Sequence, residues 1–117
     1  MANEIKMYGI ANCDTIKKAR TWMEKNGVSY VFHDYKKSGI SPDKLEEWLL
    51  QVDLDVLLNK RGTTFRKLPD MIKENVNETT AIPLMVEHPS MIKRPVLEYE
   101  GGIIVGFKGP EYDAAVN

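Results

Sequence analysis

The chain has 117 residues, enough to bury a hydrophobic core as one domain, and its 43% hydrophobic and 28% charged residues are ordinary for a globular protein. A net charge of -1 at pH 7 excludes a general electrostatic attraction to nucleic acid or membranes. No apolar run approaches the length of a membrane span, and the N-terminus has no secretory signal pattern. One cysteine cannot form an internal disulfide. We therefore expect a single domain over residues 1–117, monomeric and cytoplasmic, without nucleic-acid or membrane partners.

The first third of the chain predicts a strand, a helix and a second strand. Residues 5–8 form a short apolar run, and residues 14–26 place apolar side chains on one face of a helix. Gly27 is suited to end that helix. Residues 30–34 are rich in aromatic and β-branched side chains, which is typical of a strand. A short β-α-β crossover implies parallel strands with a right-handed connection.

The middle of the chain predicts a series of short helices. Ser41 followed by Pro42 is a strong helix start, because serine caps the N-terminus and proline suits the first turn. The segments expected next are a helical turn over residues 55–58, a basic polar loop over 59–64, and helices over 70–75 and 79–88. Pro83 is tolerable only near the start of the last helix, and Pro89 should end it.

The C-terminal part predicts a hairpin and a last helix. Residues 96–99 and 103–107 read as strands, and Gly101-Gly102 between them favours an antiparallel turn. A helix is expected over residues 111–116. The complete order is β-α-β, a helical insert at about residues 41–90, then β-β-α. This order predicts an α/β, thioredoxin-like fold with a mixed four-stranded sheet.

The only cysteine, Cys13, lies where the first strand gives way to the first helix. The free backbone N–H groups and the dipole at a helix N-terminus favour the thiolate, which is the nucleophilic form. Lys17, Lys18 and Arg20 add positive charge nearby. The alternative is a small buried hydrophobic residue, since free cysteine is among the most buried residue types.

Four motifs in this order resemble the arsenate-reductase-like (ArsC/Spx) family. They are Asn12-Cys13 after the first strand, Arg61 in the basic loop, Glu87-His88-Pro89, and Lys93-Arg94-Pro95-Val96-Leu97. The resemblance covers essentially the whole chain. The run from Tyr8 to Ala19, together with Arg61-Gly62-Thr63-Thr64 and Gly106-Phe107-Lys108, is similar to the small YffB-like branch of that family.

The resemblance implies roles for particular residues. Cys13 matches the nucleophilic cysteine of the family's reductases, and Arg94 matches the arginine beside their active site. Pro95 matches the thioredoxin-fold proline that follows a cis peptide bond, so we expect a cis Arg94–Pro95 bond close to Cys13. The resemblance further implies substrate-binding roles for Arg61, Lys108, Asn12 and Pro95; Arg61 is shifted by about two residues from the arsenate reductases' register.

Two positions depart from the family pattern. Arsenate reductases have a histidine four residues before the cysteine, where this chain has Gly9. Spx regulators have a Cys-x-x-Cys pair, and the second position of that pair is Ile16 here. The first departure argues against arsenate as the natural substrate. The second excludes a disulfide switch within the chain.

Two classes of function follow. The first is a monothiol oxidoreductase that uses glutathione as co-substrate, acts on a small oxyanion or disulfide, and needs neither a metal nor a tightly bound cofactor. Glutathione is expected because no second thiol in the chain can reduce an adduct on Cys13. The second is a Spx-like regulator that binds RNA polymerase without the Cys-x-x-Cys switch. A catalytically inactive thioredoxin-like scaffold is a third reading.

Overall fold

The computed structural model describes residues 4–116, which form two compact units. One comprises the described residues of Met1–Tyr35 and Arg94–Asn117, and we call it the sheet unit. The other, Lys36–Lys93, is the inserted unit, a few residues wider at each end than the expected insert. No helix in the described part of the chain has the length and apolar character needed to cross a membrane.

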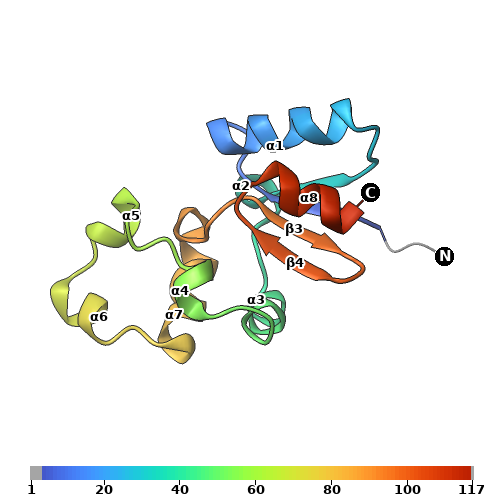
Figure 1. Cartoon of the computed structure of the whole chain (residues 1–117). Helices are drawn as coiled ribbons and strands as arrows, with labels where there is room; N and C mark the ends of the chain where they lie inside the picture. Colours follow the sequence, from blue (N-terminus) through green and yellow to red (C-terminus); the bar gives the residue numbers. More distant parts are fainter. Residues whose placement is uncertain (1–3, 117) are drawn as a thin grey trace. The chain divides into compact units, whose positions relative to one another are not determined.

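A four-stranded mixed sheet organises the sheet unit (Figure 1). Its strands are β1 (Lys6–Gly9), β2 (Val31–Asp34), β3 (Val96–Tyr99) and β4 (Gly102–Val105), in the order β2-β1-β3-β4. The β1–β2 pair is parallel, whereas β3 is antiparallel to both β1 and β4. The fold class predicted from the sequence is therefore confirmed: the chain has an α/β, thioredoxin-like fold. β4 ends before the expected residue 107 because Gly106 turns the backbone with φ +88°.

Helices α1 (Asp14–Lys25) and α8 (Gly109–Val116) pack on one face of this sheet. The core between them consists of fully buried side chains from both strands and helices: Met7, Ile16, Ala19, Met23, Leu97 and Tyr112. The rings of Trp22 and Phe107 meet Tyr112 edge-on, with centroids 5.6 and 4.9 Å away. This packing fixes the axis of α1, and with it the position of Cys13 at the helix start.

The inserted unit is a chain of short helices. They are α2 (Tyr35–Ser38, whose first residue belongs to the sheet unit), α3 (Pro42–Leu49), α4 (Leu54–Leu57), α5 (Thr63–Arg66), α6 (Asp70–Glu74), α7 (Glu78–Glu87) and the 3₁₀ helix η1 (Pro89–Met91). The expected start of α3 is confirmed, since Ser41 Oγ accepts a hydrogen bond of 3.1 Å from the Lys44 N–H.

The sequence prediction fails at three places in this region. It does not anticipate α2 or α5, and the basic loop expected over 59–64 ends at Gly62, where α5 is about to begin. Pro83 lies inside α7 and not near its start. The helix tolerates it because a capping box between Asn77 and Thr80 secures the N-terminus. Thr79, whose carbonyl loses its partner to the proline, is exposed to water.

The C-terminus of α1 matches its prediction in detail. Gly27 has φ +66°, and its N–H donates to the Glu24 carbonyl at 3.2 Å. The Val28 N–H donates to the Met23 carbonyl at 3.0 Å. These two bonds form a Schellman motif, which needs the left-handed conformation that glycine adopts at no steric cost.

Replacing Gly27 by alanine should therefore lower the free energy of unfolding by about 1 kcal/mol, measured by urea denaturation. Apart from residues 26–28 themselves, no heavy atom lies within 4 Å of the added methyl group, so the loss would come from the backbone conformation. Gly27→Asn should be milder, because asparagine visits this region more readily. Equal losses for both variants would contradict this explanation.

Candidate active site

Cys13 occupies the N-cap position of α1, with extended backbone angles of φ -148° and ψ 130°. Its side chain is partly exposed. The backbone N–H groups of Ile16 and Thr15 face the sulfur closely enough to stabilise its charged form, although the thiol makes no full capping hydrogen bond. The expected placement of the thiol at a helix N-terminus is thus confirmed.

Opposing effects set the pKa of Cys13. Partial burial raises the pKa of the thiol, whereas the Ile16 and Thr15 N–H groups and the Arg94 guanidinium lower it, and together they outweigh burial. The net pKa lies below the usual value for cysteine. Arg94 acts in two ways, through a hydrogen bond to the thiol and through its positive charge. The thiolate is therefore more favoured than in an ordinary cysteine, and Arg94 is the cation that contributes to this effect.

The expected contribution of Arg20 to this site is wrong. Its Nε donates a hydrogen bond of 3.0 Å to the Tyr30 hydroxyl, and its guanidinium carbon lies 4.4 Å from the centroid of the Phe32 ring. Arg20 therefore joins α1 to β2 as a structural contact. Arg94 supplies the positive charge, and it comes from a segment about eighty residues further along the chain.

Arg94 lies directly before β3, and the Arg94–Pro95 peptide bond is cis, as predicted. Pro95 is buried, and its carbonyl accepts a hydrogen bond of 2.8 Å from the Gly106 N–H. A Cβ placed on Gly9 would lie 3.6 Å from the Arg94 Cβ, so the arginine returns to the end of β1. The antiparallel pairing of β3 with β1 is what brings it there.

A polar and aromatic cluster lies near Arg94, and the sequence analysis did not anticipate it. Tyr8 donates a hydrogen bond of 2.9 Å to Glu98 Oε1, and the rings of His33 and Tyr35 lie 4.8 and 6.4 Å from the Tyr8 ring. Burial raises the pKa of Tyr35 far above its usual range; Tyr8 and Glu98 reinforce this effect and Arg94 opposes it. Tyr35 is therefore a neutral phenol within the field of Arg94.

The other predicted site residues have different surroundings. Asn12 is exposed, immediately before Cys13. Lys108 is exposed at the residue before α8, and its ammonium group forms no hydrogen bond or ion pair within residues 4–116. Arg61 belongs to the inserted unit. The structure thus joins Cys13 to Arg94 by direct contact, but shows no such contact for Lys108.

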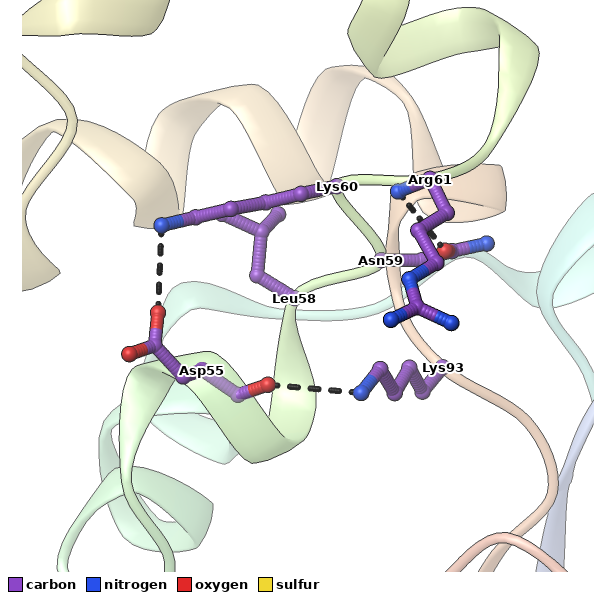
Figure 2. Close-up of a pocket in the computed structure, with 6 residues that line it drawn as sticks. All are labelled: Asp55, Leu58, Asn59, Lys60, Arg61 and Lys93. Atoms are coloured by element: carbon purple, nitrogen blue, oxygen red, sulfur yellow. Dashed lines mark hydrogen bonds and ion pairs between the residues drawn. The ribbon is translucent and has the colours of Figure 1, made fainter.

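Arg61 lines a pocket of about 490 Å³ in the inserted unit, which we call the cationic pocket (Figure 2). Its lining residues are Asp55, Leu58, Asn59, Lys60, Arg61 and Lys93. That Asp55, Lys60 and Lys93 line this pocket with Arg61 was not predicted from the sequence. The available signals were that Lys60 adjoins Arg61 in the basic loop and that Lys93 begins the Lys93-Arg94-Pro95 motif.

The packing around Gly9 explains why the chain has no histidine at this position. A Cβ on Gly9 would overlap Ile16 Cδ1 and lie 3.0 Å from Ile16 Cγ1. Ile16 is fully buried in the core beneath α1 and cannot simply move aside. A side chain at residue 9 would therefore force Ile16 or the backbone around it to shift. Within residues 4–116, no three His, Cys, Asp or Glu side chains are placed to share a metal ion.

Comparison with known proteins identifies the family of this chain. The ArsC family model matches residues 8–115. The chain belongs to the ArsC family. Among solved structures, the YffB protein is 50% identical with a TM-score of 0.93, over 97% of this chain and 99% of that one. An arsenate reductase (ArsC) related protein from Brucella melitensis is 51% identical with a TM-score of 0.76, over 96% and 93% of the two chains.

Two curated relatives show the breadth of this ArsC-family group. An uncharacterised protein of Haemophilus influenzae is 40% identical over 95% of this chain and 97% of its own length. The global transcriptional regulator Spx 2 of Bacillus anthracis is 28% identical over 92% of this chain and 82% of its own. This ArsC-family protein is therefore related both to arsenate reductases and to Spx regulators.

The electrostatics of Cys13 predict how its reactivity depends on pH. Because the pKa of the folded protein's thiol is lowered, the rate of alkylation by iodoacetamide should stay high as pH falls, with a midpoint below the unperturbed value of about 8.5. Arg94→Ala should move the midpoint upward, since it removes a charge that favours the thiolate. Arg20→Gln is the matched control and should leave it unchanged. A wild-type midpoint at the free-thiol value would contradict this electrostatic model.

The contact between Gly9 and Ile16 can be tested by a double-mutant cycle. Gly9→Ala should lower the free energy of unfolding by about 1–3 kcal/mol, as overpacking usually does. Ile16→Val removes the Cδ1 atom with which the new methyl group would collide. The double variant should therefore lose less stability than the sum of the two single variants. Strictly additive losses would show that the two positions do not compete for space.

Proposed function

We propose that this protein is a monothiol oxidoreductase that uses glutathione as its co-substrate and Cys13 as its nucleophile. The observation that carries the proposal is the lowered pKa of the partly exposed Cys13 thiol, at a helix N-terminus and in hydrogen-bonding contact with Arg94. An accessible thiol with a lowered pKa, and so with a larger thiolate fraction than an ordinary cysteine, has the two properties that a redox nucleophile needs.

The proposed reaction has two balanced thiol–disulfide exchanges. In the first, the Cys13 thiolate attacks the glutathione sulfur of a mixed disulfide; a Cys13–glutathione disulfide forms, and the substrate sulfur leaves as a thiolate that takes a proton from solvent. In the second, a glutathione thiolate attacks that adduct at the glutathione sulfur, which releases the Cys13 thiolate and oxidised glutathione. The mixed disulfide is thus reduced to a free thiol, and the glutathione it carried leaves joined to one further glutathione as oxidised glutathione.

Each residue of the site has a proposed role in these two exchanges. Arg94 stabilises the Cys13 thiolate before the attack and again as it leaves in the second exchange. Asn12 and Pro95 lie next in the chain to these two residues and would contact the substrate's backbone. Lys108 and Arg61 would bind carboxylate groups, because ammonium and guanidinium groups pair with carboxylates.

The proposal includes small disulfides or oxyanions as substrates and the cytoplasm as the compartment. Glutathione is the external thiol because the chain has a single cysteine and so cannot resolve its own adduct. At Gly9, where arsenate reductases carry a histidine, an added side chain would collide with Ile16. We therefore do not propose arsenate as the natural substrate.

The similarity to the regulator Spx 2 supports a second candidate, a polymerase-binding regulator. With Ile16 in place of a second cysteine and buried in the core, such a regulator could not switch by an internal disulfide. A binding module also has no need of an activated thiol. The reactivity of Cys13 therefore separates the two candidates.

Incubation with oxidised glutathione, followed by intact-mass analysis, tests the leading proposal. We expect the wild type to gain one glutathione and to lose it again when reduced glutathione is added. Cys13→Ser should gain none, and Arg94→Ala should react more slowly than the wild type. Arg20→Gln, which removes an arginine engaged in structural contacts, serves as the control. A wild type that resists glutathionylation but binds an RNA polymerase subunit would favour the regulator.

A further inference from the structure

We propose that the cationic pocket of the inserted unit is a carboxylate-binding site, formed by Arg61 and Lys93 and tuned by Asp55, that takes a carboxylate of glutathione. The choice of glutathione rests on the proposed function. The assignment of the pocket rests on its own residues, and it adds Lys93 as a second cation and Asp55 as a residue that tunes the site.

The charge of the pocket favours an anionic ligand. Three cationic side chains, Lys60, Arg61 and Lys93, line the pocket together with one carboxylate, Asp55, so its formal net charge is +2. Lys60 Nζ lies 3.1 Å from Asp55 Oδ1, and this ion pair partly neutralises both groups. The charge left for a ligand therefore belongs chiefly to Arg61 and Lys93.

Arg61 and Lys93 also keep hydrogen-bond donors that form no bond within residues 4–116. The Arg61 guanidinium forms no hydrogen bond or ion pair within residues 4–116. Lys93 Nζ donates to the backbone carbonyl of Asp55 at 3.3 Å, which leaves two of its three N–H groups for another acceptor. Figure 2 shows the Arg61 guanidinium and the Lys93 side chain on the same side of the pocket. A planar carboxylate suits such a fork, because arginine binds it through two parallel hydrogen bonds.

Backbone hydrogen bonds hold together the two segments that carry Arg61 and Lys93. The Asn59 N–H donates to the Met91 carbonyl at 2.7 Å, and the Lys93 N–H donates to the Leu57 carbonyl at 2.8 Å. Leu58 and Ile92 form a β-bridge between these two bonds. The segments that carry Arg61 and Lys93 are thus fixed to each other without a ligand, and such preorganisation lowers the entropy lost on binding.

The size and lining of the pocket favour an organic ligand. A volume of about 490 Å³ falls within the range of small-molecule sites and exceeds what a single inorganic anion would fill. Leu58 is 1% exposed and adds an apolar side chain to the lining. The pocket therefore suits an organic ligand that ends in a carboxylate better than it suits a bare oxyanion.

Asp55 is a positioning residue that affects ligand binding at this site in two opposite ways. Its backbone carbonyl holds Lys93, whereas its side-chain carboxylate occupies Lys60 and competes with an anionic ligand. Asp55→Asn keeps the carbonyl but removes the competing charge. The substitution should therefore strengthen ligand binding, an outcome that loss of a purely structural residue would not give.

Binding of S-methylglutathione, which carries both carboxylates but cannot react with Cys13, tests the proposal by titration calorimetry on the full chain. We expect Arg61→Gln to weaken binding about tenfold and Lys93→Gln about fivefold, as loss of a bidentate and a single charged contact would. Arg66→Gln is the matched control, because Arg66 is exposed in the same unit but does not line the pocket. Asp55→Asn should bind more tightly than the wild type. Thermal denaturation would verify that each variant is folded.

Two further ligands identify the chemistry that is recognised. The diethyl ester of S-methylglutathione should bind the wild type about as weakly as the acid binds Arg61→Gln. Inorganic phosphate should compete only weakly. The proposal would be overturned if S-methylglutathione did not bind, if the ester bound as well as the acid, if phosphate displaced the peptide at equal concentration, or if Arg66→Gln weakened binding as much as Arg61→Gln.

The pocket and the catalytic proposal can fail separately. If Cys13 is glutathionylated but Arg61→Gln and Lys93→Gln bind S-methylglutathione like the wild type, only the pocket assignment is wrong. If those variants weaken binding while wild-type Cys13 resists oxidised glutathione, the pocket binds the peptide and the oxidoreductase proposal is wrong.

Discussion

The interaction on which the site depends is the stabilisation of the Cys13 thiolate by the start of α1 and by Arg94. Burial alone would leave an inert neutral thiol, since it raises the pKa. For the pKa of the thiol to fall, the helix must begin at Cys13 and the arginine before β3 must reach the sulfur. The packing of α1 on the sheet secures the first condition, and the antiparallel pairing of β1 with β3 secures the second.

Local rules were sufficient to predict much of this from the sequence. The β-α-β opening, the glycine that ends α1, the Ser41 cap and the C-terminal hairpin all depend on residues close together in the chain. The contacts that the sequence could not show are long-range. The tyrosine–glutamate hydrogen bond beside Arg94 joins residues 90 positions apart, and the bond from Lys93 to the Asp55 carbonyl spans 38. Arg20 illustrates the limit, because its charge is near Cys13 in sequence but engaged by aromatic rings in the structure.

The two units carry complementary chemistry. The sheet unit holds Cys13, the proposed nucleophile, and Arg94, which lowers the pKa of its thiol, whereas the inserted unit holds a preorganised pair of cations with few protein partners. Lys93 ends the inserted unit and Arg94 begins the returning part of the sheet unit, so one dipeptide serves both. Each proposal concerns one unit by itself: thiol exchange in the sheet unit and carboxylate binding in the inserted unit.

The most direct test of the account is a titration of the Cys13 thiolate itself by its ultraviolet absorbance, as the difference between the wild type and Cys13→Ser. The account predicts that the thiolate signal of the wild type develops below the pH at which a free cysteine ionises, and that Arg94→Lys, which keeps the charge but loses the guanidinium fork, falls between the wild type and Arg94→Ala. A wild-type curve that coincides with that of free cysteine would contradict the central claim, because Cys13 would then be an ordinary thiol.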